Sequence, residues 1–178
     1  SPGSEGVANA IDGTQAKYLN RDSATPPKPA GFVVTPSVGV TWVTGLAMQS
    51  ANDAPERDPK SITLEGSNDD KATGFATGTW EMVYKNDAVP TFTARFQTQT
   101  FLFDNVKPYK HYRWTVLSTA TANSCCMQIA EVQLLGSGAP KNVVQPGDPV
   151  IASSANSPGS EGVANAIDGT QAKYLNRD

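Results

Sequence analysis

The sequence repeats itself at its two ends. Residues 1–22, SPGSEGVANAIDGTQAKYLNRD, recur letter for letter as residues 157–178. Chance does not reproduce a mixed segment of this length, so the offset of 156 residues between Ser1 and Ser157 is the period of a tandem repeat. The sequence therefore predicts a module that occurs in several copies within a longer array.

The composition excludes two classes of partner. Charged residues make up 17% of the chain, against about 25% in ordinary soluble domains, and the net charge is −3. Lys and Arg form no cluster, so we expect no nucleic-acid binding, which needs grouped cations for phosphate contacts. No apolar run approaches the roughly 20 residues of a membrane-spanning helix, and we expect no membrane insertion.

Short segments rich in β-branched and aromatic residues alternate with turn residues, which is typical of an all-β domain. The expected strands are Phe32–Thr35, Val40–Gln49, Ser61–Glu65, Trp80–Tyr84, Thr91–Thr98, Thr100–Phe103, His111–Val116 and Ile129–Leu135. No segment has a helical period. The 15 Gly and 13 Pro fit a turn-rich β-sandwich or barrel.

Alternation within the strands predicts which side chains face the core. The expected inward residues are Ile62, Leu64, Tyr112, Trp114, Val116, Val132 and Leu134. The expected outward residues are Thr63, Glu65, His111, Arg113, Thr115 and Glu131. Gly45 is a candidate β-bulge in the second strand.

The domain boundaries follow from the repeat. Residues 137–149 form a Pro/Gly linker, and residues 150–178 carry a first strand and loop of the next repeat. The strand candidate consists of the assembly residues Val150, Ile151, Ala152 and Ser153. Residues 1–136 are therefore expected to form a sandwich that lacks its first strand and has an open sheet edge.

Two kinds of assembly would supply the missing strand at that open edge. In a continuous chain, the preceding repeat supplies the strand and the modules follow one another like beads. With separate subunits, the Val150–Asp178 segment inserts into a neighbour by strand addition, and a head-to-tail filament results.

The two cysteines, Cys125 and Cys126, are adjacent. Three states are open: a strained bridge between neighbours, bridges to other chains in an oxidising setting, or free thiols with one buried and one exposed.

Four ordered motifs carry a family resemblance. They are VANAIDGTQAKYLN (Val7–Asn20), ITLEGSND (Ile62–Asp69) followed by Trp80 and Glu81, YKHYRWTV (Tyr109–Val116) and IAEVQLLG (Ile129–Gly136). Together they resemble the galactose-binding-like domains, which include discoidin and coagulation-factor C-type modules and related carbohydrate-binding modules. The resemblance implies a jelly-roll-like β-sandwich of about eight strands.

The same resemblance implies a structural calcium site, built from oxygen ligands. The implied residues are Asn9, Asp12, Thr14, Lys17 and Glu131, with Asp168 and Thr170 in the repeated loop. Lys17 stands where many relatives carry Thr, so it would offer only its carbonyl. The chain has a single Glu131 for two copies of the loop, so Glu131 can complete the calcium-ligand set of only one copy. The alternative is a plain Asp12–Gly13 turn and a solvated Glu131.

Sugar sites in related modules lie on loops at one end of the sandwich. The candidates here are Asn52, Asp53, Arg57, His111 and Arg113. The alternative is that the first three make turn hydrogen bonds and an ion pair.

Catalysis has little sequence support, because the period holds a single His, no Ser/His/Asp spacing and no metal-protease signature. We therefore expect no enzyme. The first functional hypothesis is a structural repeat of an extracellular fibre or giant surface protein, whose partners are copies of itself. The alternative is a tandem carbohydrate-binding, lectin-like adhesin that binds glycans and gains avidity from repetition. Both place the protein outside the cell or on its surface.

Overall fold

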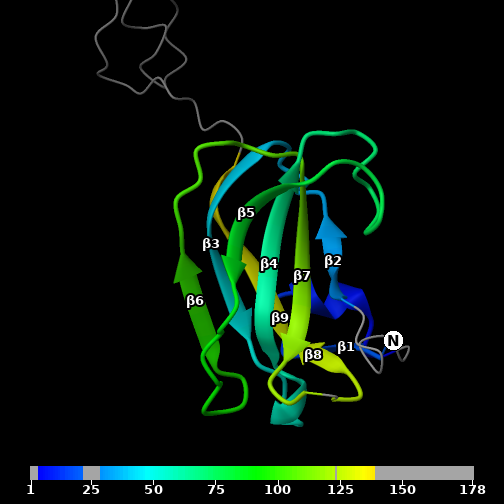
Figure 1. Ribbon diagram of the computed structural model, residues 1–178, viewed down its shortest axis with the longest axis vertical. Coiled ribbons are helices and arrows are strands. Elements are labelled where there is room, and N and C mark those ends of the chain that lie inside the picture. Colours follow the sequence, from blue (N-terminus) through cyan, green and yellow to red (C-terminus); the bar gives the residue numbers. More distant parts are fainter. Residues whose placement is uncertain (1–3, 22–28, 123, 139–178) are drawn as a thin grey trace, which may run out of the picture. The chain divides into compact units, whose positions relative to one another are not determined.

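A computed structural model describes residues 4–21, 29–122 and 124–138 (Figure 1). Its elements are η1 (Val7–Ile11), β1 (Tyr18–Asn20), β2 (Ala30–Val34), β3 (Thr41–Gln49), η2 (Pro55–Arg57), β4 (Pro59–Ser67), β5 (Glu81–Asn86), β6 (Thr98–Leu102), β7 (His111–Thr119), β8 (Met127–Ile129) and β9 (Glu131–Gly138). Both η elements are short 3₁₀ helices. Within the described ranges, no helix has the length and apolarity needed to cross a membrane.

The strands form two facing antiparallel sheets and a small third one (Figure 1). One sheet has the order β2-β7-β4-β5 and the other β6-β3-β9, while β1 pairs with β8. The predicted all-β sandwich is confirmed, with nine strands in the described residues against about eight expected. β9 continues to Gly138, two residues into the expected linker.

The core lies between the sheets and is centred on β4 and β7. Ile62 pairs with Val116 and Leu64 with Trp114, and these four side chains are buried as predicted. The Phe32 ring of β2 packs on Trp114 with 5.4 Å between centroids. The predicted bulge is also present, because the β3–β9 register shifts between Val43 and Gly45.

The opposite face of β4 and β7 is less exposed than predicted. Thr63 and Thr115 are paired across the two strands, and both are buried. Directly opposed side chains on one face lie about 5 Å apart, so these short side chains cover each other. His111 and Glu131, also expected outward, are buried as well.

Two predicted strands are wrong in detail. Residues 91–97 form a loop, because the Oε1 atom of Gln97 accepts the backbone N–H groups of Thr93 (2.7 Å) and Ala94 (3.3 Å) and diverts them from a ladder. The expected strand Ile129–Leu135 is interrupted at Ala130, where the chain leaves its pairing with β1 and joins β3.

The assembly residues Val150, Ile151, Ala152 and Ser153 lie outside the described residues, as does the whole second copy of the repeat.

A buried ion pair fixes the start of β4. The Asp58 side chain is 4% exposed and that of Arg95 is 23% exposed. Two guanidinium nitrogens of Arg95 donate to Asp58, at 3.0 and 2.6 Å, and Arg95 Nη1 also donates to the Asp53 carbonyl at 3.2 Å. Burial raises the pKa of Asp58, and the Arg95 contacts oppose that rise. Arg95 therefore favours the charged form of a buried carboxyl group and holds the loop that precedes β4.

Replacing Arg95 by methionine should destabilise the domain by about 3 kcal/mol at pH 7, the lower end of the range for breaking a buried pair. Without Arg95, the pKa of folded Asp58 rises further above its unfolded value. The folded variant then gains stability from protonation of Asp58 as the pH falls through that pKa. The difference in unfolding free energy between the wild type and Arg95→Met should therefore be smaller near pH 4 than at pH 7. Urea denaturation at both pH values measures this.

The matched control is Lys85→Met, which removes an exposed pair with Asp87 at 2.8 Å and should cost less than about 1 kcal/mol. Equal losses in the two variants, or an Arg95→Met deficit independent of pH, would contradict the account of Asp58.

Candidate functional site

The loop from Asn9 to Lys17 is held in a defined conformation by its own polar groups. The Nδ2 atom of Asn9 donates to the carbonyls of Ser4 (3.0 Å) and Lys17 (2.9 Å). The Thr14 N–H donates to Asp12 Oδ1 at 2.8 Å, an Asx turn, and the Ala16 N–H donates to Thr14 Oγ1 at 3.0 Å. Asp12 and Thr14 thus sit in a closed, oxygen-rich loop.

Glu131 reaches this loop from the start of β9. Its Oε2 atom accepts the Gly13 N–H at 3.1 Å, and Gly13 has a left-handed backbone conformation with φ of 74°. The side chain faces inward beneath the loop, which corrects the predicted outward orientation. Burial, and then the negative charge of Asp12, raise the pKa of Glu131. The negative charges of Asp12 and Glu131 thus disfavour each other, and a cation bound to both would stabilise both.

The Lys17 ammonium points away from these carboxylates. It donates to Asp53 at 2.8 and 2.9 Å and lies 3.4 Å from Glu5. Its positive charge is thereby neutralised outside the loop, while its carbonyl faces Asn9. The lysine is thus compatible with a cation at Asp12 and Glu131.

A polar cavity of about 290 Å³ borders the loop, with Gly13, Thr14 and Glu131 among its lining residues. The described residues contain no group of three or more His, Cys, Asp or Glu side chains suited to a metal. A cation here would rely on two carboxylates completed by carbonyl and hydroxyl oxygens, a donor set that suits calcium. Asp168 and Thr170 lie outside the described residues.

The five predicted ligand residues do not form one cluster. Asn52, Asp53 and Arg57 precede the first residue of β4, whereas His111 pairs with Ser67, the last residue of that strand. Nine strand residues span roughly 26 Å at about 3.3 Å each. The structure thus separates the predicted group into two ends of the sandwich.

The residues at the far end already have internal partners. His111 is buried, and its Nδ1 atom lies 2.7 Å from Thr35 Oγ1. Arg113 binds Glu65 through two nitrogens, at 2.8 and 2.9 Å. Its guanidinium also lies over the Trp80 ring, 4.7 Å from the centroid. These contacts indicate a structural role for both residues.

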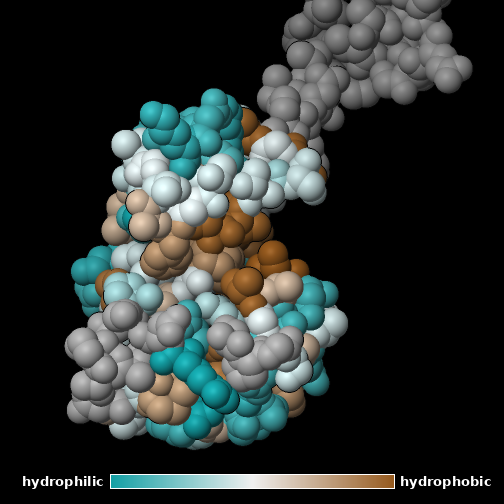
Figure 2. Space-filling view, turned by 90° about the vertical axis from the view of Figure 1, so that its right-hand side faces the viewer, coloured by the Kyte–Doolittle hydropathy of each residue, from teal (hydrophilic) through white to brown (hydrophobic). Residues whose placement is uncertain are grey.

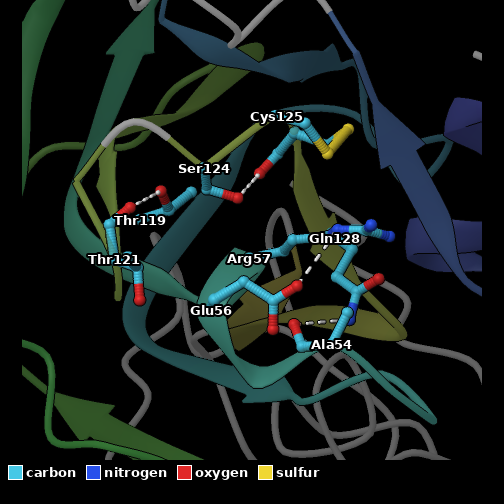
Figure 3. The surroundings of a disulfide bond; sticks show 9 residues. Ala54, Glu56, Arg57, Thr119, Thr121, Ser124, Cys125 and Gln128 are labelled. Atoms are coloured by element: carbon cyan, nitrogen blue, oxygen red, sulfur yellow. Dashed lines mark hydrogen bonds and ion pairs between the residues drawn. A yellow bond between two sulfur atoms is a disulfide. The ribbon is translucent and has the colours of Figure 1, made fainter.

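The near end is organised by Gln128, a residue that sequence reasoning missed. This buried β8 side chain donates through Nε2 to the carbonyls of Asp53 and, at 3.2 Å, Ala54 (Figure 3). Ala54 has φ of 45°, a left-handed conformation that needs such support. No local pattern marks Gln128, because its partners lie more than 70 residues earlier.

Arg57 is less constrained than its neighbours. Its guanidinium makes one ion pair, with Glu56 at 3.6 Å, and no hydrogen bond to the described residues. The Arg57 side chain is 27% exposed and that of Glu56 is 45% exposed. This end therefore offers exposed donors and acceptors on a rigid loop.

Cys125 and Cys126 form a disulfide bond with each other. The predictions of free thiols and of bridges to other chains are therefore wrong. Cys126 is buried and Cys125 is exposed, and the Ser124 hydroxyl donates to the Cys126 carbonyl at 3.0 Å. Figure 3 shows Glu56, Arg57 and Gln128 in the surroundings of this disulfide.

Solved structures resemble this chain, although no protein-family profile and no curated protein matches it. A family 32 carbohydrate-binding module of NanJ from Clostridium perfringens, in complex with galactose, has 15% identity and a TM-score of 0.56, over 74% of this chain and 85% of that one. The family 32 module of EndoD from Streptococcus pneumoniae has 15% identity and a TM-score of 0.56, over 77% and 89%.

An F5/8 type C domain from Bacteroides fragilis has 15% identity and a TM-score of 0.54, over 74% of this chain and 81% of that one. At such identities, the likeness establishes the fold, and function has to be argued from the site. The chain has the galactose-binding-like fold of family 32 carbohydrate-binding modules and F5/8 type C domains.

Proposed function

We propose that the module is a non-catalytic carbohydrate-binding domain for galactose-type sugars. The observation that carries the proposal is the end of the sandwich at η2, where Glu56 and Arg57 lie in the surroundings of the Cys125–Cys126 disulfide (Figure 3). A solved module of this fold is in complex with galactose, which supports this class of ligand.

The chemistry of this end suits a sugar. Sugar hydroxyls both donate and accept hydrogen bonds, so they match the Arg57 guanidinium, which donates no hydrogen bond to the described residues, and the exposed carboxylates of Glu56 and Asp53. Neither 50–58 nor 124–128 contains Phe, Tyr or Trp. We propose that Cys125, an exposed residue, provides the apolar surface for the C–H face of the ring.

We also place the protein outside the cell. Disulfides persist in oxidising compartments and are rare in the cytosol, and this chain contains one. The repeated 22-residue segment supports a second role, as a structural repeat in an extracellular array whose partners are copies of itself. The two roles are compatible, because identical modules in series raise the avidity for a glycan surface.

Replacing Arg57 by glutamine should weaken galactose binding by roughly 10- to 100-fold, because a hydrogen bond from a charged group contributes about 1.5–3 kcal/mol. Isothermal titration calorimetry of the full chain measures the affinity. The matched control is Lys85→Gln, on the exposed strand β5, which should bind as the wild type does.

A set of glycans should be titrated in parallel. If Arg57→Gln and Lys85→Gln bind alike, the sugar does not use the η2 end. If the wild-type chain binds none of the glycans, the proposed function is wrong.

We propose, in addition, that the Asn9–Lys17 loop and Glu131 hold a structural calcium ion. The repulsion between the Asp12 and Glu131 carboxylates and the hydrogen bond from the Gly13 N–H to Glu131 support this, as does the neutralisation of the Lys17 charge by Asp53. When bound, the ion would supply the positive charge that these carboxylates lack and would fix the loop against β9.

Calcium at 100 times its dissociation constant should stabilise the domain by about 2.7 kcal/mol. Thermal denaturation with calcium and with a chelator measures the shift, and Glu131→Gln should abolish it. The control is Asp104→Asn, at an exposed loop position, which should keep the full shift. A wild-type transition that chelation leaves unchanged would rule out the calcium site.

A further inference from the structure

An apolar groove of about 400 Å³ lies on the side of the sandwich formed by β2 and β9. Its lining includes Phe32 and Val34 of β2, and Val132 and Leu134 of β9. Within the described residues, β2 pairs only with β7 and β9 only with β3. The groove therefore runs between two sheet edges that have no neighbouring strand in the described part of the chain. Figure 2 shows hydrophobic residues gathered in a hollow on one face of the molecule.

Apolar side chains at the rim of this groove are exposed. Ile11, at the end of η1, is 49% exposed, and Val38 is 64% exposed. Grouped apolar exposure of this kind marks an interaction surface, and an unpaired strand edge is a template for another strand. The groove thus combines an apolar floor with backbone groups that an extended segment would satisfy.

The repeat identifies an occupant of matching chemistry. The segment Val150–Ser153 is short, apolar and rich in β-branched residues, and it precedes the second copy of the repeat. Ser160 is the counterpart of Ser4, and seven residues from Ser153 span at most about 25 Å. The second copy of the sequence that forms η1 in the first copy is thus preceded closely by a candidate strand.

The donor segment, Val150–Ser153, and the acceptor groove between β2 and β9 belong to different copies of the repeat. Val150–Ser153 stands before the repeated segment 157–178, one period after the module that contains the described groove. The sequences of β2 and β9 each occur once in these 178 residues, so a second groove would come from a further repeat or from another molecule.

We propose that Val150–Ser153 of one copy adds to the free edge of β9 in a second copy and covers the groove between β2 and β9. The contact is heterologous and repeats head to tail, so it extends into a linear array. Its backbone pairing with β9 and the burial of Val150 and Ile151 do not depend on the sugar site at the η2 end.

Two variants separate the donor from the acceptor. Ile151→Asp places a charge in the donor segment, and Val38→Asp places one at the exposed rim of the groove. The matched controls are Val143→Asp, in the linker, and Val106→Asp, at a residue that is 94% exposed and outside the groove lining. Sedimentation velocity over a range of concentrations measures the mass of the full-length chain, and circular dichroism checks that each variant is folded.

The wild type and both controls should associate progressively as concentration rises, whereas each single variant should remain a monomer. An equimolar mixture of Ile151→Asp and Val38→Asp should form dimers and nothing larger, because one intact donor then meets one intact groove.

Two results would overturn the proposal. One is a wild-type monomer at all concentrations whose β9 amides exchange at the same rate as in Ile151→Asp. The other is a monomer whose β9 amides are protected only when Ile151 is intact, which would assign the groove to the segment of the same molecule.

Discussion

Burial of one face of β4 and β7 against β3 and β9 is the constraint on which the rest of the structure depends. The pairs Ile62–Val116 and Leu64–Trp114 set the register of the central strands. A slip of one residue would turn every core side chain outward. Because the strands form the core, polar side chains that are open to a ligand lie in the loops at the ends of the sandwich, as at η2. Backbone groups without a strand partner lie at the sheet edges, as at the groove beside β9.

The loop from Asn9 to Lys17 connects the two proposed interaction surfaces. Lys17 extends from this loop to Asp53, which belongs to the proposed sugar-binding end. Ile11, within this loop, and Glu131, which accepts a hydrogen bond from it, both contribute to the lining of the groove. A cation at Asp12 and Glu131 would therefore stiffen both surfaces. Such a shared support would serve both the proposed glycan binding and the proposed contact between copies.

The local sequence pattern was sufficient to predict most of the fold. Alternation located Ile62, Leu64 and Trp114 in the core, and an isolated glycine marked the bulge at Gly45. Pattern failed where a side chain competes with the backbone ladder, as Gln97 does in the loop before β6. It also failed at Ala130, where a continuous apolar run changes from one sheet to the other.

The candidate sites were less predictable, because they depend on contacts between distant residues. Asp12 and Glu131 were joined through a family resemblance rather than through spacing. Gln128 could not be identified, since its role arises only when β8 lies against the loop at Asp53. His111 and Arg113 were wrongly grouped with Arg57, because the sequence alone does not show at which end of the sandwich each strand begins.

A crystal structure of the full chain with galactose tests the central claim most directly. The account predicts sugar density between Arg57 and the Cys125–Cys126 disulfide, whereas a sugar bound at the opposite end, near Arg113, would contradict it.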